Sequence, residues 1–127
     1  MIHFEIFVTD MTAAQIFYGH LFGWSFEKMS GGEDANYHLI ISDALAGHMT
    51  GGMLARNTQM PKPGSGVRGS CLTIAVAKVD ALYDWALSNG GAEALPPTDY
   101  PGIGRVAYIE DGQGNIVGMI SPTEDGE

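Results

Sequence analysis

The feature of this 127-residue sequence that most constrains its fold is a weak internal repeat with an offset of 68 residues. The shift brings apolar and turn positions into register: Phe4, Ile6 and Val8 with Leu72, Ile74 and Val76, and Gly23 with Gly91. Few positions are identical, but the apolar pattern recurs. A repeat of this length indicates two copies of one supersecondary unit rather than one continuous sheet.

Each half predicts a strand, a helix and three further strands. In the first half, alternating apolar residues predict a strand. The four-residue spacing of Phe17 and Leu21 predicts a helix, which Thr12 begins and Gly23 ends. The elements expected in this half are strand 3–8, helix 12–23 and strands 24–29, 36–42 and 48–55. Those of the second half are strand 70–76, helix 79–91 and strands 92–95, 104–110 and 115–121.

These elements predict an α+β fold of two paired βαβββ modules that form a cup-shaped mixed sheet within a single domain, 1–127. The first module spans 1–56 and the second spans 68–121. Residues 57–67 are rich in Pro, Gly and Ser, which is typical of a connector. Residues 122–127 form a polar, acidic tail.

Alternation divides the first strand of each module into two sides. One side is expected under the module's helix, and the other is expected to face a cavity enclosed by the two sheets. The cavity side is predicted to carry His3, Glu5 and Phe7 in the first module and Cys71, Thr73 and Ala75 in the second. His3 and Glu5, two residues apart, are the candidate catalytic pair, because a carboxylate can orient an imidazole as a base.

Composition excludes several classes of function. The formal net charge of −9 and the pI of about 4.6 disfavour binding to nucleic acid. No apolar run approaches the roughly 20 residues of a membrane span, and the start, MIHFEIFVTD, does not resemble a signal peptide. The single cysteine, Cys71, permits no internal disulfide. We therefore expect a cytoplasmic protein with no nucleic-acid or membrane partner.

Four stretches cover most of the chain and carry a family resemblance: FEIFVTDMTAAQIFYGHLFGW, GGMLAR, LTIAVAKVDALYDWALSNGGA and YPGIGRVAYIEDGQGNIVGMIS. Their order and spacing are similar to those of the vicinal oxygen chelate superfamily, which includes glyoxalase I, bleomycin-resistance proteins and extradiol dioxygenases. FYGHLFGW and DGQGN are the more specific pieces. They most resemble the glyoxalase-like branch related to lactoylglutathione lyase. The resemblance implies paired βαβββ modules, a cup-shaped sheet and, often, a homodimer.

The resemblance also raises the question of a metal. Metal-using members take a divalent ion on His, Gln or Glu side chains from the first and last strands of each module. In this sequence the first-strand positions fall on His3 and Cys71. The last-strand position of the second module falls on Gly118, and that of the first module lies within 50–52, which holds no carboxylate.

One imidazole and one thiol do not suit a hard cation such as Mg²⁺ or Ca²⁺, which prefers several oxygen ligands. A zinc site would need further ligands, such as Glu5 or His48. We therefore predict no metal at the family position and no cofactor, with a divalent metal as the alternative.

The expected partner is a small organic molecule. Besides His3 and Glu5, the residues predicted to line its site are Phe7, Trp24, Met53, Cys71, Thr73, Tyr100 and Tyr108. The loop YPGIGR is either a plain connection or a lid, and DGQGN is predicted to be a hairpin turn.

Three functions stay open at this point. The chain could be a metal-free small-molecule binder or enzyme. It could be a metal-dependent lyase, isomerase or dioxygenase with altered ligands. It could also be a non-enzymatic dimeric module whose side chains fill its own cavity.

Overall fold

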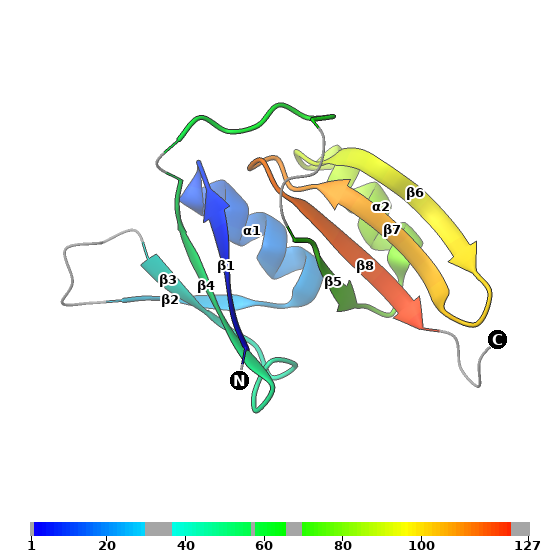
Figure 1. Cartoon of the computed structure of the whole chain (residues 1–127), viewed down its shortest axis with the longest axis horizontal. Helices are drawn as coiled ribbons and strands as arrows, with labels where there is room; N and C mark the ends of the chain where they lie inside the picture. Colours follow the sequence, from blue (N-terminus) through cyan, green and yellow to red (C-terminus); the bar gives the residue numbers. More distant parts are fainter. Residues whose placement is uncertain (1, 30–36, 57, 66–69, 123–127) are drawn as a thin grey trace. The chain divides into compact units, whose positions relative to one another are not determined.

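The computed structural model describes residues 2–29, 37–56, 58–65 and 70–122, and the chain divides into two compact units, Met1–Met60 and Pro61–Glu127 (Figure 1). Each unit is one βαβββ module, so the predicted α+β fold is confirmed. Outside the described residues lie residue 36 of the predicted strand 36–42, residues 57 and 66–67 of the connector, residues 68–69 of the second module and residues 123–127 of the tail.

The first module contains one helix and a four-stranded mixed sheet. Its elements are β1 (Ile2–Val8), α1 (Met11–Phe22), β2 (Ser25–Lys28), β3 (Tyr37–Ile41) and β4 (Met49–Ala55). The strand order is β1-β4-β3-β2, in which β1 is parallel to β4 and the other pairs are antiparallel. The first strand therefore pairs directly with the last strand of its own module.

The second module repeats this topology. Its elements are β5 (Leu72–Ala75), α2 (Val79–Ser88), β6 (Ala92–Tyr100), β7 (Gly104–Glu110) and β8 (Ile116–Pro122), in the strand order β5-β8-β7-β6. Strand β6 is longer than the predicted strand 92–95. It continues through Pro96 and Pro97 because it is an edge strand with register shifts at Glu93/Leu95 and Leu95/Thr98, where proline is tolerated.

The register of the parallel pairs extends the repeat to the last strands. Ile6 lies opposite Met53 in the first module, as Ile74 lies opposite Met119 in the second. On the other side of each sheet, Glu5 lies opposite Gly52 and Thr73 lies opposite Gly118. Each module thus places a glycine of its last strand beside the polar side of its first strand.

The start of α1 corrects the prediction that Thr12 begins the helix. The N-cap is Asp10, whose carboxylate accepts a hydrogen bond of 3.0 Å from the backbone N–H of Ala13. Aspartate caps as well as threonine does, so the helix begins earlier, soon after β1 ends. At the other end Gly23 adopts a left-handed conformation with φ 70°, as the sequence predicts.

The core of the first module lies between its sheet and α1. Tyr18 is buried and stacks on Trp24, with ring centroids 5.4 Å apart and an interplanar angle of 6°. Ile6, Val8 and Met53 are buried as well. In the second module α2 contributes Val79, Tyr83 and Ala86 to the core, against apolar side chains of β7 and β8. In the described part of the chain, no helix has the length and apolarity needed to cross a membrane.

Two polar contacts join α2 to the β6–β7 hairpin. Arg105 donates to both carboxylate oxygens of Asp80, at 2.5 and 2.9 Å, and to Asp99 at 3.0 Å. The guanidinium lowers the pKa of the Asp80 carboxyl. The hydroxyl of buried Tyr83 donates to the Glu93 carboxylate. Burial and this carboxylate raise the pKa of Tyr83 to about 12.

We expect Tyr83 to ionise late in an alkaline titration that is followed by phenolate absorbance. Since its pKa in the folded state exceeds the ordinary value of 10.0, its stabilising contribution is complete below pH 10 and is lost as the pH rises toward 12. A Tyr83→Phe variant should lack this late ionisation, whereas Tyr100→Phe should retain it. Loss of the late step from Tyr100→Phe instead would contradict the assignment.

Candidate functional site

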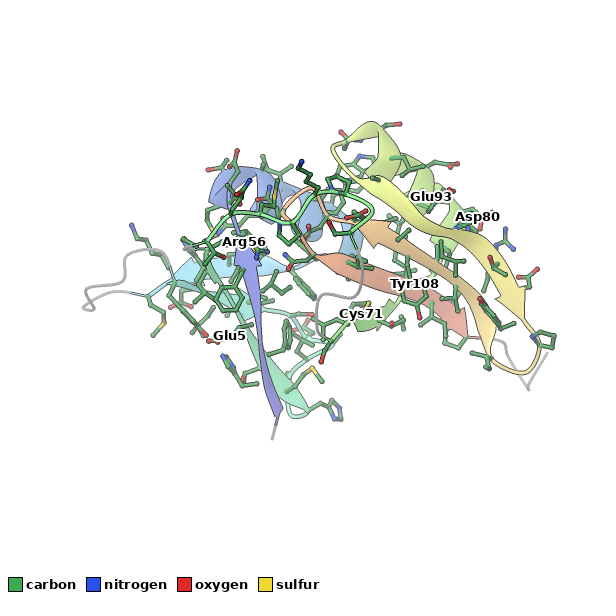
Figure 2. The ribbon with its side chains drawn as sticks, turned by 45° about the horizontal axis from the view of Figure 1, so that its top comes forward. Glu5, Arg56, Cys71, Asp80, Glu93 and Tyr108 are labelled. Carbon is green, nitrogen blue, oxygen red and sulfur yellow. The ribbon has the colours of Figure 1, made fainter. Side chains whose placement is uncertain are left out.

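The exposed side of β1 carries the two residues that the sequence singles out for chemistry. His3, Glu5 and Phe7 are exposed, whereas Ile6 and Val8 are buried on the side of α1. This alternation is the one that the sequence predicts. Figure 2 shows Glu5 on this strand of the first module. An imidazole, a carboxylate and an aromatic ring therefore share one face of the sheet.

His3 is held by hydroxyl groups at both ring nitrogens. Its Nδ1 lies 2.6 Å from Oγ1 of Thr50 on β4, and its Nε2 lies 2.8 Å from the hydroxyl of Tyr37 on β3. The same Tyr37 hydroxyl donates to Oε2 of Glu5 at 3.0 Å. His3 Nε2 is 3.6 Å from this oxygen, so Tyr37 bridges the imidazole and the carboxylate.

The network fixes the direction of its hydrogen bonds. An ionised carboxylate only accepts, so the Tyr37 proton points at Glu5 and the Tyr37 oxygen accepts from Nε2–H of His3. In a neutral imidazole Nδ1 is then the acceptor, and it receives the Thr50 hydroxyl proton. Every donor in the chain Thr50–His3–Tyr37–Glu5 points toward the carboxylate.

A glycine in β4 makes this chain possible. Gly52 lies opposite Glu5, and a Cβ at Gly52 would be 2.1 Å from the Tyr37 hydroxyl oxygen and 2.4 Å from Tyr37 Cζ. The phenol therefore lies across the bare backbone of Gly52 to reach the first strand. Its desolvation and its contact with Glu5 raise the pKa of Tyr37.

Sequence reasoning missed Tyr37 and Thr50. Both share the side of the sheet that carries His3 and Glu5, but they are 34 and 47 residues away from His3 along the chain. The alternation of Tyr37, Leu39 and Ile41 within the predicted strand 36–42 was the available signal. It marks a shared face, but it does not reveal which strand is the neighbour.

The corresponding face of the second module has different chemistry. Cys71 and Thr73 are exposed, and the Cys71 thiol lies 3.4 Å from the backbone carbonyl of Ile116. Burial of the sulfur raises the pKa of this thiol. Figure 2 shows Tyr108 on the sheet of the second module. Tyr108 lies opposite Gly118, and a Cβ at Gly118 would be 2.7 Å from the Tyr108 ring. No imidazole or carboxylate occupies the positions that match His3 and Glu5.

The other residues predicted to line the ligand site lie in different parts of the structure. Trp24 and Met53 are buried within the first module; Met53 lies opposite Ile6 and therefore shares its side of the sheet, away from His3. Tyr100 ends β6, is 40% exposed, and is followed by the tight turn that forms most of YPGIGR. The DGQGN stretch connects β7 to β8 as a hairpin turn, in which the Asp111 carboxylate accepts from the backbone N–H of Gln113 and Asn115.

The residues of the two modules do not fit the metal that the resemblance implies. Among the described residues, no three His, Cys, Asp or Glu side chains cluster closely enough to hold an ion. In the first module both nitrogens of His3 contact hydroxyl groups rather than further metal donors. Gly52 and Gly118 supply no side-chain ligand at the last strands. On the sheet faces where the family places its metal, the possible donors are therefore the imidazole of His3 and the carboxylate of Glu5 in the first module and the thiol of Cys71 in the second.

Comparison with known proteins identifies relatives by sequence. The family model described as "Glyoxalase/Bleomycin resistance protein/Dioxygenase superfamily" matches residues 1–119. A protein of Mycobacterium bovis named "Putative glyoxylase CFP32" is 33% identical over 120 residues, which is 91% of this chain and 42% of that protein. A Mycobacterium tuberculosis protein of the same name matches equally. The chain therefore spans about two fifths of the length of these curated relatives.

Comparison of structures shows the same fold in proteins of low sequence identity. The fosfomycin resistance protein FosX of Listeria monocytogenes, in complex with Mn(II) and 1S,2S-dihydroxypropylphosphonic acid, aligns with a TM-score of 0.72 and 11% identity, over 99% of this chain and 94% of its own. TnmS3, an antibiotic binding protein from a Streptomyces species, aligns with a TM-score of 0.67 and 20% identity, over 97% and 96%.

Proposed function

Since the chain belongs to the glyoxalase/bleomycin resistance protein/dioxygenase superfamily, we propose that it binds a small organic molecule on the exposed face of the first module's sheet without using a metal. His3, Tyr37 and Glu5 supply the polar contacts. The observation that carries this proposal is the hydrogen-bonded chain that joins these three side chains on one accessible face.

The residues around this hydrogen-bonded group of side chains suit an organic ligand. Phe7, which is 42% exposed, follows Glu5 on the same side of β1, and Leu54 lies opposite Phe7 on β4. Ile41 is exposed on the same side of β3. Ligand sites are mostly apolar, with few polar groups that fix orientation. This face offers that combination, with the imidazole–phenol–carboxylate chain as the polar part.

The donor set supports a metal-free mode of binding. Proteins of this fold include FosX, which was crystallised with Mn(II), and TnmS3, which is described as an antibiotic binding protein. In this chain Gly118 cannot ligate, and Tyr37 lies between His3 and Glu5. These features favour a binder or a metal-independent acid–base catalyst over a metal-dependent lyase, isomerase or dioxygenase.

The proposal predicts that small aromatic fragments perturb the NMR signals of His3, Tyr37 and Phe7 in metal-free buffer. His3→Ala should weaken such binding by about tenfold, the equivalent of 1.4 kcal/mol, which is typical of a lost hydrogen bond to a charged or strongly polar group. His20→Ala is the matched control, because His20 is an exposed histidine on α1. Fragments that bind equally to the wild type and the His3→Ala variant would contradict the proposal.

Elemental analysis of the purified protein tests the metal-free part separately. We expect far less than one metal ion per chain, with the same content in the wild type and in His3→Ala. Stoichiometric metal that is lost on this substitution would instead favour the metal-dependent alternative.

We further propose that the protein is a cytoplasmic homodimer. In support, β1 and β5 are each an outer strand of their own module's sheet, and outer strands are common sites of pairing between chains. Native mass spectrometry at micromolar concentration tests the dimer, and a monomer mass would contradict it. The ligand contacts predicted for Cys71, Thr73, Tyr100 and Tyr108 stay predictions.

A further inference from the structure

We infer that Thr50 is a hydroxyl nucleophile that His3 activates, and that it accepts the acyl group of small activated esters. The inference rests on the proposed function in using the same sheet face. The inference goes beyond the proposed function because it assigns a covalent step to Thr50, a residue that the binding proposal does not need.

The first observation is the contact between a candidate nucleophile and a base. Thr50 Oγ1 lies 2.6 Å from His3 Nδ1, within the distance at which a base can remove a hydroxyl proton. Thr50 and His3 lie opposite each other on the adjacent parallel strands β4 and β1. Their pairing is therefore set by the register of the sheet rather than by a loop.

The second observation is that the base is itself oriented by further groups. The other ring nitrogen of His3, Nε2, donates to the Tyr37 hydroxyl at 2.8 Å, and Tyr37 donates to Glu5 at 3.0 Å. A nucleophile, a base and an acidic group that orients the base form the arrangement that activates hydroxyls in unrelated hydrolases. Here the phenol of Tyr37 transmits the effect of the Glu5 carboxylate to the imidazole.

The third observation is accessibility. Thr50 is exposed, and so are His3 and Glu5. An ester can therefore approach the Thr50 oxygen from the open side of the sheet. The second module is a built-in comparison, because Cys71 and Thr73 stand at the positions that match His3 and Glu5 and cannot form the same chain.

The step balances as an acyl transfer. Thr50 Oγ1 attacks the ester carbonyl carbon while its proton moves to His3 Nδ1. The Nε2–H of the resulting imidazolium stays hydrogen-bonded to Tyr37, and the nearby Glu5 carboxylate stabilises the positive charge. The tetrahedral intermediate collapses when the bond to the leaving oxygen breaks, and that oxygen departs with the electron pair as an alkoxide or phenolate. The products are acyl-Thr50, the leaving group and one proton, which His3 releases to solvent.

The test uses p-nitrophenyl acetate and follows both p-nitrophenolate release and the site of acetylation by peptide mass spectrometry. A Cys71→Ser background is needed because Cys71 is a free, exposed thiol that activated esters also modify. We expect acetyl-Thr50, absent in Thr50→Val and retained in Thr50→Ser. His3→Ala should slow the acetylation of Thr50 by about a hundredfold, the lower range for general-base catalysis. Thr12→Val, a change at an exposed threonine of α1, should leave it unchanged.

Two results would overturn the inference in variants whose NMR spectra show the native fold. One is an absence of acetyl-Thr50 when lysines are acetylated, and the other is acetylation of Thr50 at the same rate in wild type and His3→Ala. Fragment binding to Thr50→Val separates this inference from the proposed function. If fragments bind but Thr50 is not acetylated, only the assignment of Thr50 as a nucleophile is refuted. If no fragment binds the face, the binding proposal fails whatever Thr50 does.

Discussion

A Gly104→Ala variant is expected to lose about 4 kcal/mol of its free energy of unfolding, a large effect for one methyl group. Gly104 begins β7 with φ 145°, a backbone conformation that is essentially restricted to glycine. A Cβ there would lie 2.4 Å from the carbonyl oxygen of Ser121 and 2.9 Å from the Cα of Pro122. Strained backbone and overpacking each cost about 1–3 kcal/mol, and neither neighbour is a movable side-chain end.

Gly102→Ala is the matched control from the same hairpin. Gly102 has φ 76°, but a Cβ there would meet no heavy atom within 4 Å. The change should therefore add only the left-handed strain of about 1–2 kcal/mol. Urea denaturation of both variants gives the comparison. Equal losses would show that the close approach of β7 to β8 at Gly104 does not limit stability.

The sequence predicts those parts of the fold that depend on local alternation. The buried and exposed sides of β1 follow from a two-residue period over a single strand, so His3 and Glu5 could be placed on one face without knowledge of the neighbours. The absence of a side-chain ligand at Gly118 depends on the identity of one residue, so the sequence alone also predicts it.

Other features depend on competition between nearly equivalent local choices. Asp10 and Thr12 are both good N-caps, and the sequence does not show that Asp10 accepts from Ala13. Pro96 and Pro97 argue against a strand, but β6 contains them because it is an edge strand and can shift its register there. These choices are settled by tertiary pairing rather than by propensity.

The candidate site depends on strand register, which one sequence does not specify. Thr50 meets His3 only because β4 pairs with β1 in parallel with Ile2 opposite Met49. A shift of one residue would move Thr50 to the other side of the sheet. Tyr37 reaches across from β3, a strand that does not touch β1 in the sheet order. Half of the four-residue chain was therefore predictable, and the other half required the structure.

The last prediction concerns Gly52, whose lack of a side chain lets Tyr37 reach His3 and Glu5. Gly52→Ala should lower the rate of Thr50 acetylation about as strongly as His3→Ala does, by about a hundredfold, without removing any member of the chain. The new Cβ would overlap the end of the Tyr37 ring, which must leave its place between His3 and Glu5. Loss of the group that orients a catalytic imidazole can be as damaging as loss of the base itself.

The adjacent glycine provides the control for Gly52→Ala. A Cβ at Gly51 would meet the Phe4 ring at 2.4–2.8 Å on the α1 side of the sheet. Gly51→Ala should therefore lower stability and leave the acetylation of Thr50 intact. Gly52→Ala should lower the acetylation of Thr50 and leave stability nearly unchanged, because the half-buried phenol of Tyr37 can swing toward solvent. In a Tyr37→Ala background Gly52→Ala should cause no further loss of acetylation. If Gly52→Ala keeps the full rate while Tyr37→Ala loses it, the phenol does not need the bare backbone of Gly52 to orient His3.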